Sequence, residues 1–206
     1  MELSMPIQSA GLDRALDANS DEALVNAARN GDYKAFETLF LRYRQMVYRY
    51  SFQMVGRRDD AEDLVQEVFV RAYQNLSRYR DEAKFTTWLL RIATNLATDR
   101  ARMHQRRTAL EQQEAGTGLG WMTIGETEDP VKNLTDEYRV QVLRKALAAL
   151  PEHHRSLIVM RDLEGREYEE IAQILNCSVG GAKLRALRAR RALKERMTPL
   201  LEGYPA

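Results

Sequence analysis

Apolar residues recur at helical spacing near the C-terminal end of the chain. Val179, Ala182, Ala186, Ala189 and Leu193 follow one another at intervals of 3, 4, 3 and 4 residues, which places them on one face of a helix. Most of this face is alanine, so the helix can lie close against a neighbour. The pattern predicts a helix whose small-residue face packs against the preceding segment.

That preceding segment predicts a shorter helix followed by a sharp turn. Its apolar positions are Ile171, Ala172, Ile174 and Leu175. Asn176 tolerates the left-handed backbone conformation that ends a helix, and Ser178 is a good N-cap for the next one. A helix, a short turn and a second helix are typical of a helix-turn-helix, a common DNA-binding unit.

The opposite face of the second helix is the candidate DNA-binding surface. From Lys183 to Arg196 there are seven basic residues and one acid, Glu195, an imbalance that favours phosphate binding. The positions farthest from the alanine face are Gly180, Gly181, Leu184, Leu187, Arg188 and Arg191. Base edges usually meet the N-terminal part of such a helix, and leucines can touch thymine methyls. The expected base readers are Lys183, Leu184, Leu187 and Arg188. A solvated basic surface is the alternative.

Helical periodicity extends upstream and predicts two helical blocks, residues 20–107 and 133–202, after a tail of residues 1–19. In the first block, one helix is expected from Ser20 to about Asn30, and a second ends near Gly56. A third is expected from about Asp59 to Leu76, and a fourth from about Thr86 to Arg102. Periodicity fails over residues 108–132, where Gly and Pro cluster, which predicts a linker. Trp121, Met122 and Ile124 inside it either dock on a partner or pack against this chain.

Composition and charge agree with an all-α protein of the cytoplasm. The 206 residues are 44% apolar and 30% charged, enough for two small cores. No stretch approaches the about 18 apolar residues of a membrane span, the N-terminus lacks signal-peptide features, and Cys177, the one cysteine, cannot form an internal disulfide. The net charge of +1 conceals five acids between Arg57 and Glu67. Several of them line the outer face of the third helix.

Four segments carry a resemblance to a known family. They are DAEDLVQEVFVRAY (60–73), FTTWLLRIATNLATD (85–99), LPEHHRSLIVMRDLEGREYEEIAQIL (150–175) and the basic helix after Ser178. In this order and with this linker length, the chain resembles the small bacterial extracytoplasmic-function (ECF) sigma factors of the RpoE-like type from Ser20 to Met197. The resemblance implies a transcription initiation factor with two helical domains that bind core RNA polymerase and promoter DNA. The first domain would engage the minus-ten element and the second the minus-thirty-five element.

The resemblance also implies which residues carry each role. Core polymerase would bind Asp63, Gln66, Glu67 and Arg71, although a solvated acidic face is the alternative. The loop from Leu76 to Lys84 corresponds to a pocket for a flipped minus-ten base, whose capture favours melted DNA without ATP. The minus-ten residues would be Ser77, Arg78, Tyr79, Arg80, Lys84, Arg91, Asn95, Asp99 and Arg100. The minus-thirty-five residues would be Gly181, Lys183, Leu184, Arg185, Leu187, Arg188 and Arg191.

Some positions remain open or depart from the family. Phe85 and Trp88 are expected in the core, whereas Tyr79 is left open between packing and base stacking. Family members commonly carry Thr or Val at the positions of Gly181 and Ala182, and Ser at that of Leu184, so the promoter sequence cannot be transferred. Glu167 stands where a Ser N-cap is frequent, which predicts a weaker cap.

The resemblance implies no catalytic residue, cofactor, metal, small-molecule substrate or membrane insertion. It implies an anti-sigma factor as a further partner, control by a stress or envelope signal, and a place at the nucleoid or the inner-membrane face.

Three alternative hypotheses rest on other features of the sequence. The acids from Asp59 to Asp63 fit the DDxxD pattern of prenyl-diphosphate enzymes, but only one such cluster occurs. His153, His154 and Cys177 suggest a metal, but lack a fourth ligand. A stand-alone helix-turn-helix regulator would bind duplex DNA without polymerase.

Overall fold

A computed structural model of the protein describes residues 19–80, 82–115 and 134–202. For residues 104–115, 134–137 and 202 it describes the backbone alone. Its elements are α1 (Asp21–Arg29), α2 (Tyr33–Val55), α3 (Arg58–Gln74), the 3-10 turn η1 (Leu76–Arg78), α4 (Phe85–Ala115), α5 (Leu134–Ala148), α6 (Glu152–Ile158), the π-helical turn η2 (Val159–Leu163), α7 (Tyr168–Ile174) and α8 (Val179–Glu202). No strand occurs among the described residues, so the all-α prediction is confirmed. Trp121, Met122 and Ile124 lie outside them.

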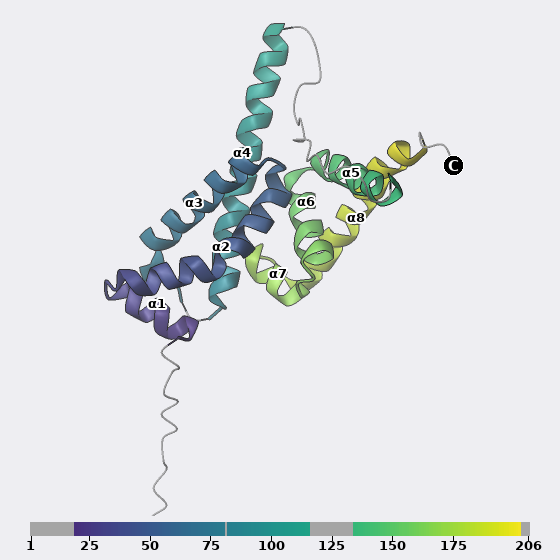
Figure 1. Ribbon diagram of the computed structural model, residues 1–206. Helices are drawn as coiled ribbons and strands as arrows, with labels where there is room; N and C mark the ends of the chain where they lie inside the picture. The colour runs from purple at the N-terminus through teal and green to yellow at the C-terminus, as the bar shows by residue number, and fades with distance from the viewer. Residues whose placement is uncertain (1–18, 81, 116–133, 203–206) are drawn as a thin grey trace, which may run out of the picture.

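Helices α1 to α4 form the first bundle, and short-range signals set their ends (Figure 1). Ser20 caps α1 by accepting a hydrogen bond from the amide of Ala23 at 3.2 Å. One carboxylate oxygen of Asp32 does the same for the first turn of α2, at 2.9 Å from the Lys34 nitrogen. Gly56 ends α2 with a φ of 78°, a left-handed conformation that costs glycine little. The predicted start at Ser20 and stop at Gly56 are confirmed.

Helix α4 is longer than the sequence pattern predicts. It was expected to end near Arg102, but it continues to Ala115 and so includes the first residues of the expected linker. Residues 103–115 contain good helix formers such as Ala, Leu, Gln and Glu and no Gly or Pro, so the backbone can stay helical without an apolar face. The helix stops where the first linker glycine, Gly116, begins the Gly-rich stretch. In Figure 1 its second half projects beyond the bundle.

Helices α5 to α8 form the second bundle, which contains the predicted helix-turn-helix. Asn176 has a φ of 50°, and the hydroxyl of Ser178 accepts a hydrogen bond from the Gly181 amide at 3.1 Å. The turn and the cap are therefore as predicted. The alanine face of α8 is fully buried at Ala182, Ala186 and Ala189. The sequence predicted α7 as its neighbour, and in the structure α8 packs against α5 and α6 as well as α7.

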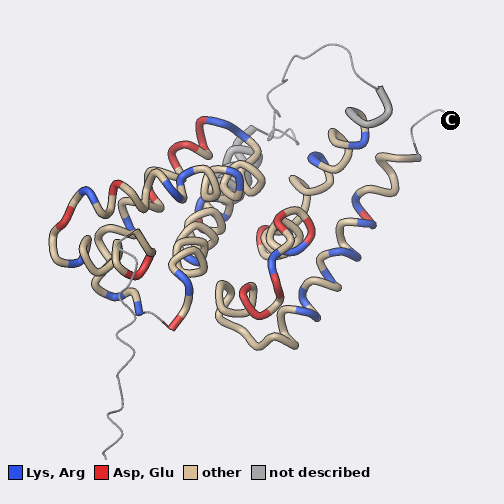
Figure 2. The backbone as a smooth tube through the Cα atoms, turned by 60° about the horizontal axis from the view of Figure 1, so that its bottom comes forward, with Lys and Arg blue, Asp and Glu red and all other residues tan. Residues whose placement is uncertain are grey.

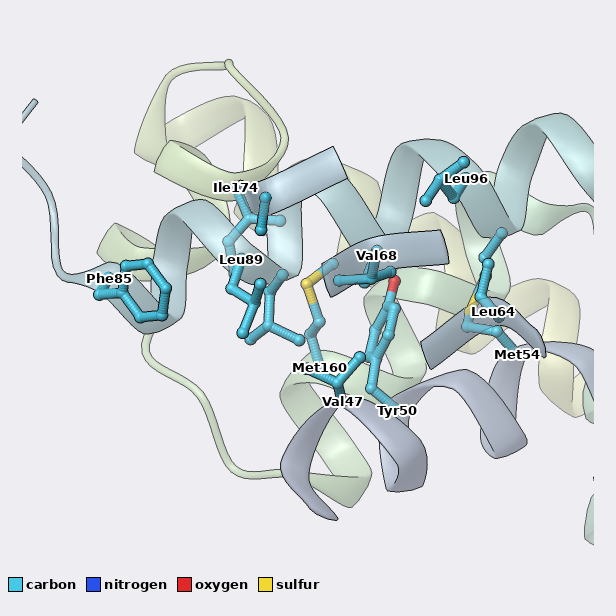
Figure 3. Packing of buried hydrophobic residues seen from close by; sticks show 14 of the residues in the cluster. Val47, Tyr50, Met54, Leu64, Val68, Phe85, Leu89, Leu96, Met160 and Ile174 are labelled. Atoms are coloured by element: carbon cyan, nitrogen blue, oxygen red, sulfur yellow. The ribbon is translucent and has the colours of Figure 1, made fainter. Parts of the chain in front are cut away.

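The two bundles contact each other and share one apolar core. Helices α6 and α7 pack against α4, and α6 also contacts α2. Figure 3 shows Met160 of the second bundle beside Val47 and Tyr50 of α2, and all three side chains are completely buried. Arg155 reaches across the boundary and donates a hydrogen bond to the Met54 carbonyl at 2.5 Å. Sequence periodicity did not predict that the two bundles would meet.

Candidate nucleic-acid interface

The outer face of α8 is basic and open to solvent. Lysine and arginine residues recur along this helix (Figure 2), and all of them are exposed. Two large apolar residues lie exposed among them, Leu184 at 48% and Leu187 at 64% of their possible surface. The exposed basic residues predicted to contact the minus-thirty-five element are Lys183, Arg185, Arg188 and Arg191. A half-exposed leucine pair between cations can cover apolar base edges while its neighbours contact phosphate or base nitrogen and oxygen atoms.

Ion pairs divide the basic residues of α8 into two groups. Arg190 points back toward η2, where its Nε lies 3.1 Å from each carboxylate oxygen of Asp162 and its Nη2 lies 2.5 Å from one of them. This bidentate pair raises the pKa of Arg190 and holds α8 in place. Arg191 pairs with Glu195 at 3.1 Å, but both side chains are largely exposed. An exposed pair of this kind is weak, so Arg191 is available to DNA whereas Arg190 is engaged within the protein.

Gly181 lies in the first turn of α8, where space is restricted. A Cβ atom at this position would come 3.1 Å from the hydroxyl oxygen of Ser178. That oxygen caps the helix, so a larger residue here would push against the cap. A larger residue at position 181 would need a shift of a few tenths of an ångström in the Ser178 side chain.

The turn after α3 presents a second group of basic and polar side chains. Ser77, Arg78, Arg80 and Lys84 are all exposed. Tyr79, by contrast, is 6% exposed; its ring lies 5.7 Å from that of Phe85 and 5.2 Å from that of Trp88, and its hydroxyl donates to the Ala83 carbonyl at 2.7 Å. Of the two roles left open for Tyr79, the structure shows packing. Phe85 is buried as predicted, and Trp88 is partly buried.

The same turn is held by a residue that sequence reasoning missed. Arg29, in the last turn of α1, donates from Nε to the Leu76 carbonyl at 3.1 Å and from Nη2 to the Tyr79 carbonyl. Its guanidinium carbon lies 5.5 Å from the centre of the Tyr79 ring. No local pattern in the sequence links α1 to a turn 47 residues away, so only the fold reveals this contact.

Helix α4 separates the four residues that the family resemblance grouped together. Arg91, Asn95 and Asp99 are exposed and, at intervals of four residues, lie on one helix face. Arg100 is half-buried and turned toward α3, where it donates to the Asp60 carbonyl at 3.1 Å and to a Glu67 carboxylate oxygen at 2.9 Å. Arg100 thus braces α3 against α4, apart from the exposed face.

The outer face of α3 combines acids with exposed apolar side chains. Asp63 is exposed, as is its predicted companion Gln66, whereas Glu67 is shared between Arg71 at 2.7 Å and Arg100 at 2.9 Å. Three exposed apolar residues lie on the neighbouring surface of α2 and α3, and they are Tyr33 at 67%, Val70 at 53% and Tyr73 at 47%. No sequence pattern singled them out, although Val70 and Tyr73 fall outside the buried face of α3. Large exposed apolar side chains beside charges are typical of a protein-binding surface.

Two features of the described residues bear on a metal site and on membrane insertion. Within the described residues, no group of three or more His, Cys, Asp or Glu side chains is arranged to hold a metal ion. No helix in the described part of the chain is both long and apolar enough to cross a membrane. Burial, His153 and Arg188 all lower the pKa of His154, burial most strongly.

Two family models match this chain, one in each helical bundle. Residues 39–107 match the family model Sigma-70 region 2, and residues 141–193 match Sigma-70, region 4. The ECF RNA polymerase sigma-E factor of Escherichia coli (strain K12) is 36% identical over 188 residues, which cover 88% of this chain and 96% of that protein. The RNA polymerase sigma-H factor of Pseudomonas aeruginosa is 31% identical over 189 residues, with coverage of 90% and 98%.

Two solved structures have the same fold. The sigma factor RpoE of Bartonella quintana, crystallised with the anti-sigma factor NepR, superposes with a TM-score of 0.59 at 25% identity over 84% of this chain and 99% of that one. CnrH, in complex with the cytosolic domain of CnrY, has a TM-score of 0.59 at 24% identity over 89% and 99%, and supports the fold. Near-complete coverage by ECF relatives, and the order of region 2 before region 4, lead to one conclusion. The chain belongs to the ECF family of RNA polymerase sigma factors, which are transcription initiation factors rather than enzymes.

Proposed function

We propose that this protein binds core RNA polymerase, directs it to a specific set of promoters and assists promoter melting. The observation that carries this proposal is the exposed basic face of α8, with Leu184 and Leu187 among its cations, on a helix-turn-helix within a region 4 match. Bases would meet the N-terminal half of this face, and phosphates the C-terminal half. The residue ranges 20–107 and 133–202 act as the minus-ten and minus-thirty-five domains.

The minus-ten element is assigned to the turn after α3 and the adjoining face of α4. Ser77, Arg78 and Arg80 are exposed on the turn, and Arg91 and Asn95 are exposed on α4. These side chains combine cations for phosphate with amide and hydroxyl groups for base edges. Arg100 is assigned a structural role, because Nη1 donates to the Asp60 carbonyl and Nη2 to the Glu67 carboxylate. Tyr79 supports the turn from inside and does not stack on the base.

The outer face of α3 is the proposed binding surface for core polymerase. Asp63 and Gln66 supply exposed polar groups there, and Val70 and Tyr73 supply apolar area on the same helix. An apolar surface beside an acidic one fits a partner that presents apolar side chains next to basic ones. Glu67 contributes through its shared hydrogen bonds, which orient Arg71 and Arg100.

An anti-sigma factor is proposed as the inhibitory partner. The support is the Bartonella quintana relative, which was crystallised with one, together with exposed apolar side chains on both α3 and α8. A protein that covers Leu184 and Leu187 would keep the α8 face from DNA. The proposed place of action is the nucleoid, or the inner-membrane face when the inhibitor is membrane-bound, and the signal is a stress or envelope response.

The experiment that tests this function is transcription in vitro with bacterial core polymerase and genomic fragments, with and without the purified protein. Defined transcripts that appear only when the protein is added are expected. Tight binding to duplex fragments by the protein alone, with no transcripts, would instead establish a stand-alone regulator.

Replacing Asp63 with alanine is expected to weaken core polymerase binding about fivefold, or about 1 kcal/mol. Asp63 is exposed at the centre of the acidic face, so its loss removes a charge without disturbing the core. Fluorescence anisotropy of labelled protein titrated with core polymerase measures the change. Glu22→Ala is the matched control, because it removes an exposed carboxylate from α1. Equal affinities for the two variants would remove Asp63 from the interface.

A further inference from the structure

Arg29 joins α1 to the turn after α3 by bonds to the backbone. Nε donates to the Leu76 carbonyl at 3.1 Å, Nη2 donates to the Tyr79 carbonyl, and Nη1 donates to the Asn26 side chain at 3.3 Å. Leu76 begins η1 and Tyr79 follows its last residue. A single planar guanidinium therefore holds both ends of η1, a geometry that a lysine ammonium group cannot reproduce.

Tyr79 holds the turn from the other side. Its hydroxyl donates to the Ala83 carbonyl at 2.7 Å, and its ring packs edge-on against Phe85 with centroids 5.7 Å apart. The Arg29 guanidinium lies over the same ring, 5.5 Å from its centre, a favourable position for a cation. Arg29 and Tyr79 thus together hold the turn in place from its buried side.

The exposed side chains of the turn project from this support. Ser77 and Arg78 lie within η1, between the two carbonyls that Arg29 holds, and Arg80 follows Tyr79 directly. All three are exposed, whereas Leu76 and Tyr79 are buried. Such a short turn has few bonds of its own, so without an external anchor its backbone would sample many conformations. A turn that is already ordered binds a ligand with a smaller entropy loss.

We propose that Arg29 is a positioning residue for minus-ten recognition. It holds η1 and Tyr79 in the conformation that presents Ser77, Arg78 and Arg80 to the melted strand, and it does not itself contact DNA. This inference rests on the proposed role of the turn in binding the minus-ten element. It adds a residue from α1, outside the four segments that carry the family resemblance.

The test compares Arg29→Ala and Arg29→Lys with two other variants in the full-length protein. Arg42→Ala is the matched control, because Arg42 is also an arginine anchored to the α1 region, through Asp21 at 2.6 Å, but bonds none of the described residues of the turn. Arg80→Ala removes a proposed DNA contact directly. Far-ultraviolet circular dichroism verifies that each variant is folded, and Arg29→Lys, which keeps the charge, remains informative if the alanine variant unfolds.

The first readout is hydrogen exchange at the Arg78 and Tyr79 amides, which bond to the Asn75 and Leu76 carbonyls. Exchange at least tenfold faster in Arg29→Ala, intermediate in Arg29→Lys and unchanged in Arg42→Ala is expected. The second readout is binding of holoenzyme to a single-stranded minus-ten oligonucleotide. About fivefold weaker binding by Arg29→Ala is expected, with the salt dependence unchanged because no phosphate contact is lost.

The outcomes separate the inference from the proposed function. Unchanged exchange in Arg29→Ala overturns the inference. Weaker DNA binding by Arg80→Ala with normal binding by Arg29→Ala also overturns it, while the role of the turn stands. If the slope of log binding constant against log salt concentration falls in magnitude by about one in Arg29→Ala, then Arg29 contacts a phosphate directly. That outcome also overturns the inference. If neither Arg80→Ala nor Arg29→Ala weakens binding, the turn does not read the minus-ten strand, and the proposed function of the turn fails first.

Discussion

Replacing Arg155 with alanine is expected to lower the free energy of unfolding by about 3 kcal/mol, the largest effect on stability anticipated here. Arg155 is 4% exposed and lies at the point where α5, α6 and α2 meet. Truncation to alanine removes the Arg155 donors from four buried or partly buried carbonyl groups together, and of these four the Leu147 carbonyl still accepts from the Leu150 amide. Each carbonyl left without a partner away from water has a desolvation cost.

The bonds of Arg155 explain this expectation. Nε donates to the Leu147 carbonyl at 2.9 Å, and Nη2 donates to those of Ala148 at 2.7 Å and Leu150 at 3.0 Å. The last carbonyls of a helix lack partners within the helix, and a cation there is favourable. Nη1 bonds the Met54 carbonyl at 2.5 Å across the boundary between the bundles. Burial lowers the pKa of Arg155, partly opposed by the charge of Glu152, and an arginine remains protonated under such conditions.

Urea-induced unfolding, followed by circular dichroism, measures the Arg155→Ala effect. Arg190→Ala is the matched control, since it removes an arginine whose ion pair with Asp162 is about half exposed, and a loss of no more than about 1 kcal/mol is expected for it. Arg155→Lys should recover only part of the stability, because one ammonium group cannot satisfy four carbonyls spread over two bundles. A loss in Arg155→Ala no greater than that in Arg190→Ala would show that water satisfies these carbonyls.

Replacing Arg188 with alanine is expected to reduce transcription from promoters with a minus-thirty-five element about 30-fold, or about 2 kcal/mol. Arg188 is exposed on the α8 face, one residue after the exposed Leu187. An arginine that reads a base edge contributes both affinity and sequence preference. Transcription in vitro on a promoter series, with each minus-thirty-five position substituted in turn, measures both.

Lys194→Ala is the control for Arg188→Ala. Lys194 is exposed nearer the C-terminal end of α8, where phosphate contacts are expected. Loss of this side chain should reduce transcription from all promoters by a similar factor. It should also lower, by about one, the magnitude of the slope of the logarithm of the binding constant against the logarithm of the salt concentration. Arg188→Ala should instead flatten the preference at one base position. If both variants lose activity uniformly, Arg188 is a phosphate contact and the base-reading assignment is wrong.

The local features of the fold could be predicted from neighbouring residues alone. Ser20, Gly56, Asn176 and Ser178 set helix ends through bonds or dihedral angles within a few positions. The alanine face of α8 follows from helical periodicity, and its burial confirms the prediction. The α4 boundary was placed too early, because loss of amphipathic periodicity was taken as the end of the helix although the helix formers continue to Ala115.

The exposed face of α8 was predicted more completely than the surroundings of the turn after α3. On α8 the exposed face is simply the one opposite the alanines, so a single helix determines it. Around the turn, Tyr79 and Arg100 each have several possible neighbours, and the fold decides between them. Tyr79 packs between Phe85 and Trp88, and Arg100 bonds Asp60 and Glu67. No spacing rule within the chain distinguishes these arrangements from exposed ones.

Periodicity, caps and the segregation of charge were therefore enough to define most helix ends, the class of fold and the exposed basic face of α8, because each depends on residues within a turn or two of one another. The tertiary structure alone decided which arginines hold which distant carbonyls. Arg29 bonds a turn 47 and 50 residues away, and Arg155 bonds a helix end 101 residues away. Such contacts form only when packing of apolar faces brings distant helices together, and the local sequence does not specify which helices those will be.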